Sequence, residues 1–139
     1  MTSILPTTPI TAAISPAVVT TPLQFLAGIP RNLAIQAEFT YGSGGTTVDA
    51  YVQTTFDGGG TWTDIAQFHF TTASARKIFN LSALTPVTTQ ATPTDGALAS
   101  NTAIDGIIGS QVRVKYQSAG TYAGGTALEI DVASARIVT

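Results

Sequence analysis

Hydrophobic and polar residues alternate with a period of two between positions 33 and 41. Successive side chains of a β-strand point to opposite faces of a sheet, so this alternation predicts a strand with one buried face. The residues between the hydrophobic positions are mostly polar, and the hydrophobic set is Leu33, Ile35, Ala37, Phe39 and Tyr41. No stretch of the chain shows the i, i+3, i+4 spacing of an amphipathic helix. The pattern therefore predicts an all-β protein.

The same alternation recurs downstream, and turn residues separate the segments. Further strands are predicted over 46–56, 62–70, 76–81, 107–116 and 126–138, with a short edge strand near 10–14. Trp62, Phe68 and Phe70 are expected to face inward, and one alternation cannot also accommodate Ile65, so a β-bulge is predicted near Asp64. Seven or eight strands in a chain of 139 residues predict a single-domain β-sandwich or jelly roll.

Two segments lack this periodicity. Residues 1–30 are excluded from helix by their prolines, which are Pro6, Pro9, Pro16, Pro22 and Pro30. They are predicted to form an extended N-terminal arm that precedes a β-sandwich domain over residues 31–139. Residues 82–106 are rich in Thr, Ala, Pro, Asn and Asp and are predicted to form a long loop. Loops of this length are usually functional or docked on another surface.

The composition excludes several classes of protein. The chain has no cysteine, so it has neither disulfides nor thiolate metal sites. Charged residues make up only 10% of the chain and the net charge is −2, so no basic surface is expected to bind nucleic acid. The apolar runs are too short to cross a membrane, and the first residues lack the basic region of a secretion signal. We expect a protein made in the cytoplasm whose weakly charged surface lies against other protein.

The chain offers little catalytic chemistry. Its acids are Glu38, Asp49, Asp57, Asp64, Asp95, Asp105, Glu129 and Asp131, and no pair is marked out by spacing for glycosidase chemistry. His69 is the only histidine, and no Gly-x-Ser-x-Gly motif accompanies it, so we expect neither an enzyme nor a cofactor. Zinc is excluded by the shortage of ligands, whereas Asp57, Asp95 or Asp105 with loop carbonyls leave a calcium site open as a minor interpretation.

Residues 55–62 read Thr-Phe-Asp-Gly-Gly-Gly-Thr-Trp and lie between two predicted strands. Glycines accept the positive φ angles of a tight turn, and an aspartate can bond the backbone that follows it, so the segment predicts a β-hairpin. It also resembles the Asp-box of sialidases, a Ser/Thr-x-Asp-x-Gly-x-Thr-Trp pattern repeated in those propellers. The resemblance implies that Asp57, Gly59, Thr61 and Trp62 stabilise a turn away from any catalytic pocket.

Residues 48–66 and 112–125 are similar in style to segments of the small all-β virion proteins of tailed bacteriophages. In size and in lacking catalytic residues the chain most resembles their jelly-roll capsid cement, or decoration, proteins. The resemblance implies a non-enzymatic protein of the virion, assembled in the host cytoplasm, that binds the outer capsid surface and stabilises the head. The implied partners are the major capsid protein and further copies of the chain itself, as a homodimer or homotrimer.

If this resemblance holds, the N-terminal arm is the expected contact with a neighbour. An extended, proline-ordered arm can add a strand to an exposed sheet edge or lie along a surface. The interface residues implied in this way are Ile4, Leu5, Pro6, Ile10 and Ile14. Two alternatives remain open: a structural protein of the tail or neck, and a carbohydrate-binding or receptor-binding β-sandwich in which Tyr51 and Tyr122 present outward-facing rings.

Overall fold

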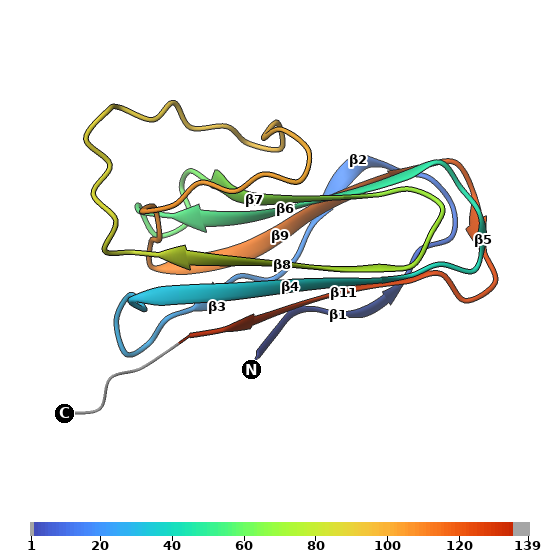
Figure 1. Cartoon of the computed structure of the whole chain (residues 1–139), viewed down its shortest axis with the longest axis horizontal. Helices are drawn as coiled ribbons and strands as arrows, with labels where there is room; N and C mark the ends of the chain where they lie inside the picture. Colours follow the sequence, from blue (N-terminus) through green and yellow to red (C-terminus); the bar gives the residue numbers. More distant parts are fainter. Residues whose placement is uncertain (1, 135–139) are drawn as a thin grey trace.

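The computed structural model describes residues 2–134 and consists mainly of two antiparallel β-sheets packed face to face (Figure 1). The first sheet has the order β1-β11-β4-β8, formed by β1 (Thr2–Pro9), β11 (Ala127–Ala133), β4 (Asn32–Thr40) and β8 (Ala75–Ser82). The second has the order β2-β9-β6-β7, formed by β2 (Ile14–Val19), β9 (Gln111–Ala119), β6 (Thr47–Thr55) and β7 (Thr63–Phe70). The predicted all-β sandwich is therefore confirmed.

Three short strands complete the architecture. The segment β3 (Leu23–Gln24) pairs with the start of β9 in the second sheet, while β5 (Ser43–Gly44) and β10 (Tyr122–Ala123) pair with each other at one end of the sandwich. The described residues form no helix, and therefore none that is long and apolar enough to span a membrane. The last strand was predicted to continue to residue 138, but positions 135–138 lie outside the described residues.

The core lies between the two sheets and follows the predicted alternation. Along β4 the side chains of Leu33, Ile35, Ala37 and Phe39 are fully buried, and β9 and β11 alternate in the same way. The ring of Phe39 stacks on that of Phe70 from the opposite sheet, with centroids 5.0 Å apart. A period of two places a continuous row of hydrophobic residues on each inner face, and burial of that area stabilises the sandwich.

The N-terminal segment belongs to the sandwich, so the prediction of an arm separate from a 31–139 domain is wrong. Strand β1 pairs with β11, and β2 and β3 pair with β9. Prolines are tolerated in strands at a sheet edge or at a bulge. Both conditions are met, since β1 and β2 lie at sheet edges and the ladders are irregular between Leu5 and Thr8 and between Ile14 and Val18, where Pro6 and Pro16 lie.

The predicted bulge near Asp64 is confirmed. Val52 pairs with Ala66 while the next residue, Gln53, pairs with Asp64, so Ile65 is the additional residue on β7. The extra residue on β7 shifts the alternation of side chains between the two faces by one position. The alternation that points Phe68 and Phe70 into the core therefore does not continue across the bulge to Trp62. Phe68 and Phe70 point into the core as predicted. The inward orientation predicted for Trp62 is wrong, because that side chain precedes the bulge and lies against Arg113 on the outer face of the sheet.

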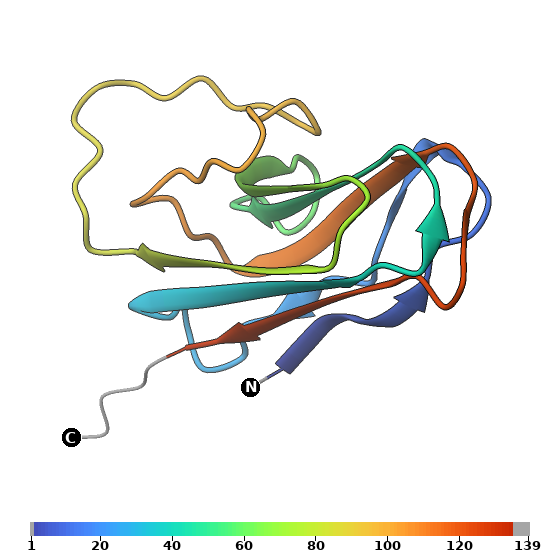
Figure 2. The same ribbon diagram turned by 45° about the vertical axis from the view of Figure 1, so that its right-hand side comes forward.

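The connection from β8 to β9, residues 83–110, lies across the outer face of the second sheet, as the yellow and orange segment in Figures 1 and 2 shows. It follows the free edge of β7 through backbone hydrogen bonds. The N–H of Asp64 donates to the carbonyl of Thr94 at 2.8 Å, that of Gln67 to Thr102 at 2.8 Å, and that of Ile104 to Ile65 at 2.9 Å. The long loop predicted over 82–106 is therefore docked on its own domain.

A buried carboxylate holds this loop in place. The side chain of Asp64 is fully buried and accepts hydrogen bonds from the backbone N–H groups of Gly96, Ala97 and Leu98. The hydroxyl of Thr94 also donates to it, at 2.8 Å. A buried charge is costly unless it is fully hydrogen-bonded, so these donors are what allow an acid at this position.

Each edge strand of the two sheets carries a feature that opposes pairing with a further strand. β1 and β2 carry prolines, and the loop covers the edge of β7. The remaining edge strand, β8, carries two adjacent cationic residues, Arg76 and Lys77.

Candidate functional site

The turn between β6 and β7 brings the four residues of the sequence motif together as a structural unit. The carboxylate of Asp57 accepts the N–H of Thr61 and the hydroxyl of Thr61, each at 2.8 Å, and the hydroxyl of Thr55 at 2.9 Å. These hydrogen bonds, the backbone one first, lower the pKa of Asp57 to about 2. The indole N–H of Trp62 donates to the carbonyl of Gly59 at 3.2 Å. Asp57 thus has its oxygens occupied by the turn itself.

His69 forms a polar cluster on the outer face of the second sheet. Its Nδ1 lies 2.6 Å from Oδ1 of Asp49, which also accepts the side-chain amide of Gln67 at 2.9 Å. No hydrogen bond within residues 2–134 joins the imidazole to a serine or threonine hydroxyl. The pair therefore lacks the nucleophile that a hydrolytic triad requires.

The other acids named as calcium candidates are also engaged by protein donors. The hydrogen bond from Gln53, followed by Lys115, lowers the pKa of Asp95. The backbone N–H of Ser82, followed by the hydroxyl of Thr85, lowers that of Asp105. In the described part of the chain no three His, Cys, Asp or Glu side chains are grouped so as to hold a metal ion.

The two tyrosines expected to present sugar-binding rings are buried. Tyr51 does point to the outer face of the second sheet, but it is only 8% exposed. Tyr122 packs edge-on against Phe39 and Tyr41, and its hydroxyl donates to the carbonyl of Thr71 at 2.8 Å. The prediction of two exposed rings is therefore wrong, because tertiary packing covers both positions.

The residues predicted to contact a partner through the arm are mostly in the core. Ile4, Leu5 and Ile10 are buried among the residues of both sheets, and Ile14 packs partly against them. Pro6 is exposed at the edge of the first sheet. A free apolar arm is therefore wrong as an interface, because the chain itself uses these side chains to close the sandwich.

The structure instead exposes hydrophobic side chains at one end of the sandwich. Eight large hydrophobic side chains are exposed within residues 2–134, and five of them lie in three connections that meet at this end. They are Leu26 and Ile29 between β3 and β4, Phe56 between β6 and β7, and Leu84 and Val87 between β8 and β9. We call these five residues the apolar end; the three connections that carry them lie at the left of Figure 1.

Backbone contacts fix the three connections beside one another. Gln111 at the start of β9 pairs with both Gln24 and Thr55, the residues at which β3 and β6 end. The N–H of Ala83 donates to the carbonyl of Arg31 at 2.7 Å, which joins the third connection to the first. Backbone hydrogen bonds therefore hold the loops that carry the exposed hydrophobic residues beside one another.

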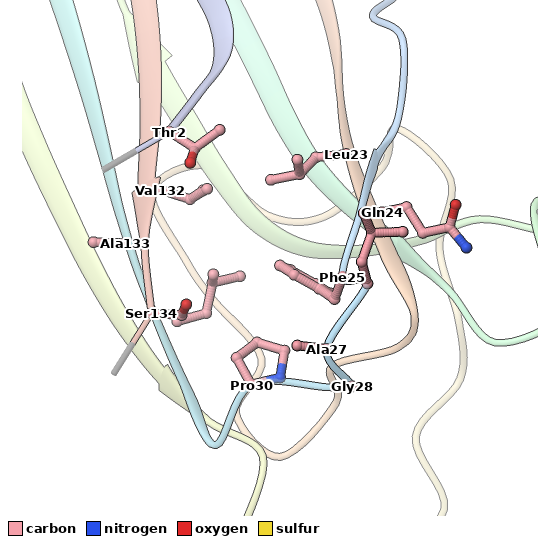
Figure 3. Close-up of a pocket in the computed structure, with 12 residues that line it drawn as sticks. Thr2, Leu23, Gln24, Phe25, Ala27, Gly28, Pro30, Val132, Ala133 and Ser134 are labelled. Atoms are coloured by element: carbon pink, nitrogen blue, oxygen red, sulfur yellow. The ribbon is translucent and has the colours of Figure 1, made fainter. Parts of the chain in front are cut away.

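Two hollows open at the apolar end. One of about 370 Å³ lies between the sheets; Figure 3 shows Leu23 and Phe25 on one wall and Val132 and Ser134 on the other. A second hollow of about 350 Å³ is mostly apolar and is lined chiefly by Phe56, Val87, Pro93, Ile104 and Ile107. Apolar concave surfaces next to exposed hydrophobic residues are typical of sites that bind another molecule.

Few charged residues lie in the three connections at this end. Arg31 follows Leu26 and Ile29 on the β3–β4 connection and belongs to neither ion pair of the described residues, which are His69–Asp49 and Lys115–Asp95. Asp57 and Asp105 directly follow Phe56 and Ile104, two residues that line the second hollow. Sequence reasoning missed the surface because its members are isolated hydrophobic residues in separate loops. Single exposed hydrophobic residues in turns were the available signal.

Comparison of the chain with protein-family models, with curated proteins and with solved structures finds no match.

Proposed function

We propose that this chain is a non-enzymatic structural protein of a tailed-phage virion that decorates the outer capsid surface and stabilises the head. The observation that carries the proposal is the strand order. Without the three short strands, β1-β11-β4-β8 faces β2-β9-β6-β7, so strands adjacent in the chain repeatedly lie in opposite sheets. This order supports a jelly roll, an architecture used in viral capsid domains.

The surface supports adhesion to protein. A contiguous group of exposed hydrophobic residues marks a contact with protein or lipid more often than one with a polar ligand. The low proportion of charged residues, 10%, reduces the number of ionic groups that docking must desolvate. The acids whose pKa is lowered are each held by donors of the same chain, which assigns them a structural role.

Hydrogen bonds that hold the loops in place support a role that needs a preordered binding surface. The turn at Asp57 and the loop held by Asp64 are both closed by charge-assisted hydrogen bonds. A preordered surface loses little conformational entropy on docking. Repetition of one contact over a symmetric shell converts a modest affinity for each copy into a large overall avidity.

Capsid binding by the purified protein tests the proposal. Mature capsids that lack the protein are mixed with it, sedimented, and analysed for bound protein and for the temperature at which they release DNA. Saturable binding and a higher release temperature are expected, while capsids already carrying the protein should bind no more. No binding and an unchanged release temperature overturn the proposal.

The number of copies per particle separates the capsid assignment from the tail or neck. On a gel of purified virions, the band should approach the major capsid protein in molar amount, because a decoration protein follows the repeat of the shell. A molar amount lower by roughly one to two orders of magnitude, as cyclic assemblies at a single vertex give, overturns the capsid assignment.

A further inference from the structure

We propose that a hollow on the outer face of the second sheet binds a neutral sugar unit, through a carboxylate that the chain holds in position with one oxygen left free. We call it the Asp49 hollow; its volume is about 220 Å³, and it is lined chiefly by Ile14, Ser15, Thr47, Asp49, Gln117 and Ala119. The inference goes beyond the proposed function, because it concerns a surface separate from the apolar end and a different class of ligand.

The Asp49 hollow lies where the outer face of the sheet is uncovered. Thr47 pairs with Ala119 in the β6–β9 ladder, and the next pair on the same face is Asp49 with Gln117. The short, exposed side chain of Ala119 leaves a depression beside the longer Gln117. No residue of the 83–110 connection lines this depression, and Figure 1 shows that connection over the other end of the face. The chain therefore leaves the hollow open to solvent.

The carboxylate of Asp49 is held through one of its two oxygens. Oδ1 lies 2.6 Å from Nδ1 of His69 and accepts the side-chain amide of Gln67 at 2.9 Å. The backbone N–H of Asn101 donates to Oε1 of Gln67 at 2.7 Å and so fixes that amide in turn. Within residues 2–134 no hydrogen bond reaches the second oxygen, Oδ2, although the side chain is 19% exposed. A group ordered in this way accepts a hydrogen bond from a ligand at little further cost in conformational entropy.

The other polar side chains of the hollow suit a ligand that carries hydroxyl groups. In the described part of the chain, the side chains of Ser15, Thr47 and Gln117 form no hydrogen bond. Each of them can both donate and accept, as a sugar hydroxyl also does, whereas an ammonium group only donates. Ile14 and Ala119 supply apolar surface for the C–H groups of a sugar ring. A mainly apolar wall with a few fixed polar groups is the usual composition of a small-molecule site.

Size and charge narrow the class of sugar. The volume of about 220 Å³ exceeds the roughly 150 Å³ of a cavity that accommodates benzene, so a six-membered ring with its hydroxyl substituents fits. Asp49 is the one charged residue among those that line the hollow. An acidic sugar would bring its own carboxylate next to this one, and like charges at a binding surface are unfavourable. The ligand is therefore a neutral sugar unit.

Titration of the isotope-labelled full chain, followed by two-dimensional NMR, tests the site. The probes are the methyl glycosides of glucose, galactose, mannose and N-acetylglucosamine, each added alone. At least one should shift the backbone amides of Thr47, Asp49, Gln117 and Ala119 saturably, with a dissociation constant in the millimolar range that a few hydrogen bonds provide. The uronic acid related to that sugar should bind more weakly, and ethylammonium should give no saturable shift. A disaccharide ending in that sugar distinguishes the end of a glycan, which binds with equal affinity, from a free monosaccharide, for which the added unit abolishes binding.

Two variants tie binding to the hollow. Gln117→Ala should raise the dissociation constant roughly threefold to tenfold, the loss expected for one hydrogen bond. Ala119→Leu places a larger side chain in the hollow and should abolish binding. Ala27→Leu is the matched control, because Ala27 is also an exposed alanine but lies on the β3–β4 connection; its affinity should equal that of the wild type. Circular dichroism and melting temperatures confirm that each variant is folded.

Three results overturn the inference. They are the absence of saturable shifts at these amides with every sugar, binding to Ala119→Leu as tight as to the wild type, and saturation by ethylammonium alone, which would reassign the hollow to a cation. Capsid binding by the protein is measured separately, so its failure counts against the proposed function and leaves the sugar site standing.

Discussion

The carboxylate of Asp64 on β7 accepts the backbone N–H of Gly96 with both of its oxygens, at 2.9 and 2.8 Å, across 32 positions of the chain. The neighbouring N–H groups of Ala97 and Leu98 converge on the same side chain. One buried acid thus organises the middle of a long connection that has little regular structure of its own. The order of residues 96–98 therefore depends strongly on this side chain.

Replacement of Asp64 should release the loop. In Asp64→Ala the N–H groups of Gly96, Ala97 and Leu98 lose their acceptor, so the free energy of unfolding should fall by about 3 kcal/mol. Amide hydrogen exchange at positions 96–98 should become faster than in the wild type. Urea unfolding and exchange measured by mass spectrometry check both results. Glu38→Gln, which neutralises an exposed acid on β4, is the control and should stay within about 0.5 kcal/mol.

The turn at Asp57 should give the protein a pH-dependent stability. The folded-state pKa of about 2 lies below the 3.8 that is ordinary for an aspartate. The ionised group is therefore favoured by folding, and its contribution is complete above pH 4 and is lost as the pH falls towards 2. Asp57→Ala should lower the melting temperature at pH 7, and the difference from wild type should shrink between pH 4 and pH 2. A difference that is constant across this range would contradict the assignment.

Trp62 should report its contact with Arg113 by fluorescence. The guanidinium carbon lies 4.3 Å from the centre of the indole ring, and Trp62 is the one tryptophan of the chain. Arg113→Ala should expose the ring to water, shift its emission to longer wavelength and cost about 1 kcal/mol. Arg113→Lys keeps the charge but not the planar stack and should give an intermediate shift. An unchanged spectrum in Arg113→Ala would show that the stack does not shield the ring.

Truncation of Phe39 should destabilise the fold strongly, whereas truncation of Phe56 should leave the free energy of unfolding nearly unchanged. Phe39 is buried between the sheets against Phe70 and Tyr122, so Phe39→Ala should lower the free energy of unfolding by about 3–5 kcal/mol. Phe56 is 63% exposed at the apolar end, and Phe56→Ala should change it by less than about 0.5 kcal/mol. Chemical unfolding of both variants and of the wild type, followed by circular dichroism, checks the contrast.

The features that could be predicted from the sequence are those that depend on neighbouring residues in the chain. The alternation from Leu33 to Phe39 identified a core strand because a period of two has one structural meaning. The conflict between Ile65 and Phe68 located a bulge for the same reason. The turn at Asp57 was readable because aspartate followed by glycines limits the backbone to few conformations.

The predictions that were wrong concern residues that a distant part of the chain pairs with or covers. Prolines at Pro6 and Pro16 indicated extended backbone correctly, but could not show that the same chain supplies the strand beside it. The pattern placed Tyr51 on an outer face, and a loop more than 30 residues away then covered that face. The apolar end depends in the same way on three loops that are far apart in the sequence and are brought together by the folded sheets.

The covered and modified sheet edges have a consequence for a chain with so few charges. An unpaired edge invites another strand to join it, and runs of such additions give cross-β fibrils. Here prolines interrupt β1 and β2, the loop occupies β7, and Arg76 and Lys77 stand on β8. We therefore expect the protein to resist amyloid growth through its edges rather than through net charge, so that close packing of many copies need not lead to strand addition.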